Sequence, residues 1–301
     1  MKYHAETAFD EALRRSVSKL CIMLESRCNA YCPYCLVEQE MSHEACARCP
    51  KNLENCKRCM DGRLDDKEFI ERLHYVLGRV VGPFCDISIS GGEPSISPRI
   101  RQTIDVANKF ECRQKSFITN GTGLLSLCAG STLAEYLMRS GWNIVLHRDH
   151  WENDRNEALM GCESLNDVQM QYLCDLFSGR LIIDCIVQTG GVCSSAGVFA
   201  YRRYARENWG DVHIRFSEIE IDPRAEGGRT EKSKELYFSI KELMASLETY
   251  KPSIRVDNDI TTYARYDELN FSLYGCRPNA RNQFGIHELI MYPDGDVGWI
   301  E

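Results

Sequence analysis

Three cysteines lie close together near the start of the chain, in the run Cys28-Asn-Ala-Tyr-Cys32-Pro-Tyr-Cys35. The spacing is C-x3-C-x2-C, so one short loop can present three thiolates to the same point. Soft sulfur ligands suit iron–sulfur binding, and three thiolates can fill three corners of a four-iron, four-sulfur ([4Fe–4S]) cluster. One iron would then stay open to a small molecule. Three structural or zinc-bound thiols are the alternative.

A second group of four cysteines follows, as Cys46-Ala-Arg-Cys49 and Cys56-Lys-Arg-Cys59. Paired C-x2-C turns are a strong metal signal because each turn presents two sulfurs. The four thiolates can close around one tetrahedral ion, so we expect a structural zinc site in residues 46–59. An auxiliary iron–sulfur cluster and free thiols are the alternatives.

A glycine-rich turn with an acidic residue, Ser90-Gly91-Gly92-Glu93-Pro94, lies directly after a predicted strand. Two glycines allow close backbone approach, and the carboxylate of Glu93 can pair with an ammonium group. Taken alone, this run is also consistent with a plain turn that carries an exposed glutamate.

The elements that position these residues alternate between short β-rich runs and amphipathic helical runs. This alternation predicts an α/β fold with βαβ units and a parallel sheet, here a partial (βα)6 TIM-like barrel. In such barrels, functional groups gather at the C-terminal ends of the strands. A turn at Pro293-Asp294-Gly295 predicts a C-terminal β-hairpin. The predicted strands are 19–24, 85–90, 115–119, 143–147, 181–188 and 212–216, and the predicted helices are 65–80, 98–110, 132–140, 165–177, 195–208 and 230–247.

Composition and charge exclude several classes of protein. The chain has 301 residues, of which 44% are hydrophobic and 27% charged, as in ordinary globular proteins. Its 16 cysteines are too dilute for a small disulfide scaffold and indicate metal binding in a reducing compartment. A net charge of -8 makes duplex nucleic acid an unlikely partner. We find no signal-peptide pattern and no long apolar run, so we expect a cytoplasmic protein without membrane contact.

The three-cysteine motif after the first predicted strand and the GGEP run after the second together resemble the radical S-adenosylmethionine (radical SAM) superfamily. The resemblance covers about residues 20–223. It implies that Cys28, Cys32 and Cys35 hold a [4Fe–4S] cluster whose open iron binds S-adenosylmethionine. It also implies that the Gly91, Gly92, Glu93 and Pro94 run holds the methionine amino group and that Tyr34 lies near the adenine. Such enzymes take an electron from a donor such as flavodoxin or ferredoxin and form a 5′-deoxyadenosyl radical.

Further candidates follow from the same resemblance. Asn120, His147 and Gln188 end predicted strands three, four and five, where cofactor contacts are expected. Glu218 follows the sixth strand and is a candidate for facing the substrate, and Cys193 is a candidate donor of a hydrogen atom.

The resemblance leaves the substrate open. We expect a peptide or small-molecule substrate, with two alternatives: an activase that installs a glycyl radical on a partner enzyme, and a non-catalytic zinc-ribbon binding protein. The expected organisation is an N-terminal segment (1–18), a core barrel (19–223) with the four-cysteine insert (46–59), and a C-terminal helix and β-hairpin extension (224–301).

Overall fold

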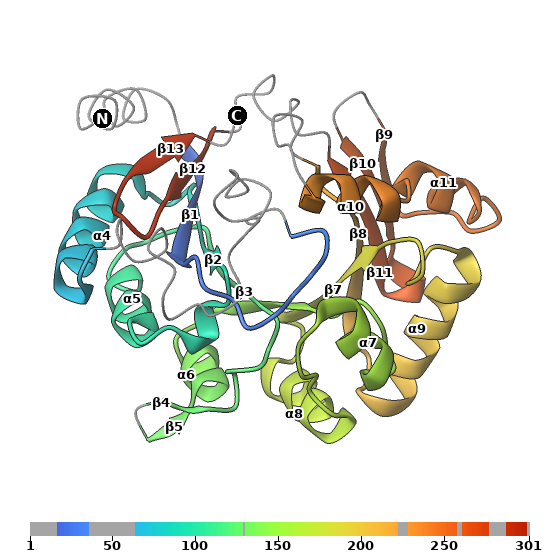
Figure 1. The fold of residues 1–301 in the computed structure, drawn as a ribbon, viewed down its shortest axis with the longest axis horizontal. Coiled ribbons are helices and arrows are strands. Elements are labelled where there is room, and N and C mark those ends of the chain that lie inside the picture. Colours follow the sequence, from blue (N-terminus) through green and yellow to red (C-terminus); the bar gives the residue numbers. More distant parts are fainter. Residues whose placement is uncertain are drawn as a thin grey trace.

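A single curved sheet positions the motifs identified in the sequence (Figure 1). The computed structural model describes residues 17–35, 64–128, 130–221, 228–257, 261–276 and 287–299. Within these ranges the main sheet has eleven strands, in the order β13-β12-β1-β2-β3-β6-β7-β8-β11-β10-β9. Its two end strands, β13 and β9, belong to opposite ends of an open half-barrel (Figure 1).

Six parallel strands form the centre of this sheet and confirm the predicted mixed α/β fold. Each predicted strand corresponds to one of them, with boundaries that differ by no more than two residues. The strands are β1 (Val17–Glu25), β2 (Asp86–Gly91), β3 (Gln114–Thr119), β6 (Asn143–His147), β7 (Leu181–Val187) and β8 (His213–Glu218).

Helices follow the central strands and cover the convex side of the sheet (Figure 1). Several begin where side chains satisfy the free N–H groups of the first turn, as in the capping box of Asp65 and Glu68. The helix α7 (Asn153–Met160) is not in the predicted set. The other helices between the central strands are α4 (Asp66–Val80), α5 (Ile100–Ala107), α6 (Leu133–Arg139), α8 (Asp167–Phe177) and α9 (Ser195–Asn208).

The two faces of the sheet differ in character because side chains alternate along a strand. On β8, Ile214 and Phe216 are buried, and the Phe216 ring lies 5.9 Å from that of Tyr201 on α9. The intervening residues of β8 face the concave side, where the sheet carries polar groups.

Short elements also occur: η2 (Pro94–Ile96), η3 (Asp267–Leu269), β4 (Leu127–Cys128) and β5 (Ser131–Thr132).

The C-terminal part of the chain extends both edges of the central sheet. Strand β11 (Phe271–Cys276) runs parallel to β8, and β10 (Thr261–Tyr266) and β9 (Ile254–Asp257) continue antiparallel beyond it. At the other edge β12 (His287–Met291) runs parallel to β1 and pairs antiparallel with β13 (Val297–Trp299). We call the strands β9, β10 and β11 the wing, and the sequence analysis did not predict them.

The single helix predicted over residues 230–247 is two helices, α10 (Gly228–Leu236) and α11 (Ile240–Ala245). The break arises because Tyr237 forms a β-bridge with Gln188, and Ser239 then caps α11. No helix within the described ranges is long and apolar enough to cross a membrane.

Candidate functional site

The glycines after β2 allow the ends of β1 and β2 to touch. The Gly92 N–H donates to the Glu25 carbonyl at 2.6 Å, and the Glu93 N–H donates to the Arg27 carbonyl at 2.8 Å. A Cβ at Gly92 would lie 2.0 Å from the Arg27 oxygen, and Gly91 has a φ of +122°. Only glycine fits these positions. The GGEP run therefore lies directly against the loop that begins the three-cysteine motif.

The three-cysteine loop is also tied to the ends of β3 and α7. Asn29 donates from Nδ2 to Thr122 Oγ1 and accepts at Oδ1 from Asn120 Nδ2, both at 2.9 Å. The Tyr31 N–H donates to the Met160 carbonyl at 2.6 Å. Gly161, with a φ of +64°, ends α7 against Tyr31, where a Cβ would lie 2.5 Å from the tyrosine Cβ.

The three thiols share one electrostatic environment. Burial raises the pKa of Cys28 to about 12 and the pKa of Cys32 well above its ordinary value. Cys35 adds to both pKa shifts, and Cys28 adds to that of Cys32. Within the described residues, however, no three His, Cys, Asp or Glu side chains are arranged closely enough to hold a metal ion as they stand. Without a metal, the Cys28 and Cys32 thiols keep their protons, and metal binding would release them. This set of soft donors on one loop fits a [4Fe–4S] cluster.

Glu93 is buried and joins the ends of β2 and β3. Its Oε1 accepts from the Ser95 N–H at 2.9 Å and from Thr119 Oγ1 at 2.5 Å, and its Oε2 accepts from the Asn120 N–H at 2.7 Å. Burial raises its pKa. The Ser95 side chain also hydrogen-bonds this carboxylate, so Glu93 already meets about as many donors as a carboxylate accepts.

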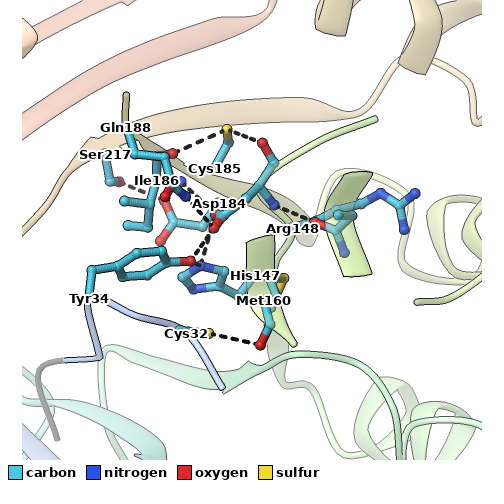
Figure 2. Close-up of polar contacts among 12 residues, drawn as sticks. Cys32, Tyr34, His147, Arg148, Met160, Asp184, Cys185, Ile186, Gln188 and Ser217 are labelled. Atoms are coloured by element: carbon cyan, nitrogen blue, oxygen red, sulfur yellow. Dashed lines mark hydrogen bonds and ion pairs between the residues drawn. The ribbon is translucent and has the colours of Figure 1, made fainter. Parts of the chain in front are cut away.

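Asp149 lies just after β6 and has polar contacts with three segments of the chain: the three-cysteine loop, the end of β6 and the end of β7. It accepts from the Tyr34 hydroxyl and from the Ile186 N–H and Gln188 Nε2, the last two at 3.0 and 2.9 Å. His147 Nε2 lies 3.1 Å from Asp149 and 3.0 Å from the Tyr34 hydroxyl. Figure 2 shows Tyr34 pointing at His147 from the three-cysteine loop, with Gln188 above them.

One acceptor in this network is left without a partner. Gln188 is fully buried, and its Oε1 has no hydrogen-bond partner among the residues that the structure describes. A buried polar atom without a partner is costly. It therefore marks a place where a bound molecule could supply a donor.

A second buried acid, Asp184, lies next to this network. It accepts from Arg215 Nε at 2.7 Å and from Ser217 Oγ at 2.6 Å. Burial opposes its charge, but Arg215 outweighs burial and lowers the pKa of Asp184. For His147, burial is likewise outweighed by Asp149 and Asp184, and the pKa of His147 is raised.

The structure thus brings together most of the residues that the sequence analysis selected. Asn120 and His147 hydrogen-bond the three-cysteine loop, at Asn29 and Tyr34. Gln188 is joined to Tyr34 of the same loop through Asp149. Sequence reasoning treated Asp149 only as part of the segment after β6 and missed Asn29. It also missed the Cys162 thiol, which lies close enough to Cys28 to raise its pKa.

The remaining candidates have other contacts or lie outside the described residues. Glu218 Oε1 accepts from the Tyr237 hydroxyl at 2.6 Å and from the Ile240 N–H at 3.0 Å, so it fastens α11 to β8. Cys193 is partly buried against the core just before α9. The insert cysteines Cys46, Cys49, Cys56 and Cys59 lie outside the described residues.

Comparisons with known proteins identify the fold. No protein-family model matches the sequence, and no curated protein matches it either. The crystal structure of SuiB from Streptococcus suis matches with a TM-score of 0.53 and 15% identity, over 82% of this chain and 49% of that one. The structure of SuiB bound to S-adenosylmethionine matches with a TM-score of 0.52 and 15% identity, over 82% of this chain and 51% of that one. This chain therefore spans about half the length of these structures, and the likeness is one of fold.

Proposed function

We propose that this chain, which has the fold of the radical SAM enzymes, is itself a radical SAM enzyme. The observation that carries the proposal is the contact between the GGEP run and the start of the three-cysteine loop, at the carboxyl ends of the parallel strands. This is the end of such sheets where functional groups gather. The SAM-bound SuiB structure, which has the same fold, supports S-adenosylmethionine as the ligand.

Each part of the site has a role in this proposal. Cys28, Cys32 and Cys35 would hold a [4Fe–4S] cluster. When reduced, such a cluster bound to S-adenosylmethionine supplies a 5′-deoxyadenosyl radical, which abstracts hydrogen from a substrate. The Gly91–Pro94 run would receive the methionine amino group, with the Glu93 carboxylate as its anionic partner. The unpartnered Oε1 of Gln188 would accept a hydrogen bond from the cofactor.

The remaining residues fix the shape of this site. Asp149 holds Tyr34 and His147 in place, and Asn120 holds the three-cysteine loop through Asn29. The substrate in this proposal is a peptide or a small molecule, and the electron comes from a donor such as flavodoxin or ferredoxin. Cys46, Cys49, Cys56 and Cys59 would hold a structural zinc ion.

Anaerobic reconstitution followed by metal analysis tests the proposal. We expect about four irons per chain from one cluster, together with one zinc. A yield of about eight irons would instead assign an auxiliary cluster to the four-cysteine insert. With reductant and S-adenosylmethionine, the loaded protein should release 5′-deoxyadenosine.

Cysteine variants give the matched comparison. Cys32→Ala should lose the cluster and the 5′-deoxyadenosine. Cys112→Ala removes a partly exposed thiol that lies just before β3, at the opposite end of the sheet, and should change neither. If wild-type chain with a full, reducible cluster releases no 5′-deoxyadenosine, the proposed function is wrong.

A further inference from the structure

The end of helix α7 lies directly against the three-cysteine loop. The Met160 carbonyl accepts from the Tyr31 N–H at 2.6 Å, and the Cys32 thiol lies 3.8 Å from the same oxygen (Figure 2). Gly161 then ends the helix against Tyr31. The last turn of α7 therefore fixes the first half of this loop.

The first half of α7 is joined to the same loop by a longer route, through Asn156. The Asn156 side chain is buried, at 3% exposure. Its Oδ1 accepts from the Asp149 N–H at 2.7 Å and from the His150 N–H at 3.2 Å, and its Nδ2 donates to Ser164 Oγ at 2.8 Å. One amide group thus holds the backbone of Asp149, whose carboxylate accepts from the Tyr34 hydroxyl.

The two N–H groups that Asn156 accepts lie away from water. Asp149 is 0% exposed and His150 is 2% exposed. A buried N–H that loses its acceptor is costly, because water does not replace the lost bond. Without the Asn156 oxygen, the backbone of these two residues has to move to find another acceptor. The Asp149 carboxylate would move with it.

The Asp149 carboxylate joins three side chains of the candidate site. It accepts from the Tyr34 hydroxyl and from Gln188 Nε2, the latter at 2.9 Å, and its Oδ1 lies 3.1 Å from His147 Nε2. Hydrogen bonds weaken steeply when their geometry is lost, and the attraction between an imidazolium and a carboxylate falls with distance. A displaced Asp149 would therefore loosen all three contacts together.

We propose that Asn156 is a positioning residue of the candidate site, which acts through Asp149 on the side chains that would receive S-adenosylmethionine. Helix α7 then fixes the three-cysteine loop at two points, Tyr31 directly and Tyr34 through Asp149. The link to S-adenosylmethionine rests on the proposed function, whereas the effect on the Asp149 contacts does not.

Variants of the full chain separate this role from a merely structural one. Asn156→Leu is similar in size but offers no acceptor to the two N–H groups. Asn156→Asp keeps that acceptor, and its second oxygen can accept from the Ser164 hydroxyl, so it should rescue the site. Asn108→Leu is the matched control: Asn108 Oδ1 also accepts two bonds, from Lys115 Nζ at 2.7 Å and Trp142 Nε1 at 3.1 Å, but at the amino end of the sheet.

The first measurement is the pKa of His147, followed by nuclear magnetic resonance in the chain without a cluster. Asp149 and Asp184 raise this pKa. In Asn156→Leu it should fall towards the ordinary histidine value of about 6.5. Asn156→Asp should keep it at or above the wild-type value, and Asn108→Leu should leave it unchanged. A merely structural role would lower the melting temperature of Asn156→Leu without moving this pKa.

The second measurement is the affinity of the reconstituted chain for S-adenosylmethionine, by anaerobic calorimetry. Asn156→Leu should weaken binding roughly tenfold, which is the usual effect of losing one charge-assisted hydrogen bond, with unchanged iron content. Asn156→Asp should recover most of this affinity, and Asn108→Leu should bind like wild type.

A wild-type pKa of His147 in Asn156→Leu would overturn the inference, as would equal affinities of Asn156→Leu and wild type for S-adenosylmethionine. If Asn156→Leu does not fold, Ser164→Ala is the milder second variant. It releases Asn156 Nδ2 and should lower the pKa of His147 by a smaller amount, and an unchanged pKa would then overturn the inference. The proposed function fails separately: a wild-type chain that does not bind S-adenosylmethionine contradicts the enzyme and leaves the His147 result standing.

Discussion

At the scale of single residues, the site depends on charges that are buried but compensated. His147 lies between two acids, Asp149 and Asp184, which together stabilise its protonated form and raise its pKa. A histidine whose pKa is higher in the folded state adds stability that is fully present below about pH 6.5 and is lost as the pH rises through the folded pKa. The site should therefore be held together more firmly in mild acid.

This dependence of folding stability on pH predicts how the stability of His147→Gln changes with pH. In urea unfolding of the apo chain, its stability deficit relative to wild type should be larger at about pH 5.5 than at about pH 8.5. His213→Gln is the control of opposite sign. Burial lowers the pKa of His213, so protonation favours its unfolded state and the variant's deficit should shrink in acid. A deficit for His147→Gln that does not depend on pH would contradict the assignment.

The sequence predicted the thiols and the GGEP run at this scale, because their signals are local. Asp149 was not singled out, because its role depends on Ile186 and Gln188, which come from the next strand and lie far along the chain. No spacing within the β6 segment indicates which acid will meet those donors. The same holds for Asn29, whose partners belong to the turn after β3.

At the scale of elements, the contact between the ends of β1 and β2 leaves no room for one added side-chain carbon. A Cβ at Gly92 would lie 2.0 Å from the Arg27 carbonyl oxygen, which is backbone and cannot move aside cheaply. Gly92→Ala should therefore push the three-cysteine loop away from β2 and lower both iron content and melting temperature. The measurements are iron analysis after reconstitution and thermal unfolding.

Gly82→Ala is the matched control for this element. A Cβ there would meet nothing within 4 Å, and the position has no positive φ. Its unfolding free energy should stay the same or rise by about 0.4–1 kcal/mol, because alanine restricts the unfolded chain. Full iron content in Gly92→Ala would mean that the contact between the two ends does not shape the site.

The central strands and their helices were predictable because their apolar patterns are strong. The wing was not, since Ile254 and Val256 alternate with polar residues over only the four residues of β9, all of which are exposed. Its stability comes from pairing with β10, which itself depends on β11. Likewise, the break between α10 and α11 follows from the bridge of Tyr237 to Gln188, a long-range contact.

At the scale of the whole molecule, residues near the two ends of the described chain complete one sheet. β11 lies beside β8 and β12 lies beside β1, so the C-terminal region is part of the core sheet as well as an extension of it. Local patterns identify strands, but they do not reveal which strands of distant origin become neighbours. Strands β11 and β10 thereby lengthen the sheet beyond β8.

The closing strands give the last prediction. Removing residues 287–301 deletes β12 and β13 and exposes the edge of β1. The truncation removes four buried side chains, Leu289, Ile290, Met291 and Val297. At roughly 1.5–3 kcal/mol each, their loss amounts to about 6–12 kcal/mol, which is comparable to the roughly 5–15 kcal/mol that stabilises a typical domain. The truncated chain should therefore lose its cooperative thermal transition and aggregate through the open edge.

Asp296→Asn alters an exposed residue of the same hairpin and should stay within about 0.5 kcal/mol of wild type. A truncated chain that melts cooperatively near the wild-type temperature would show that the sheet is stable without these strands.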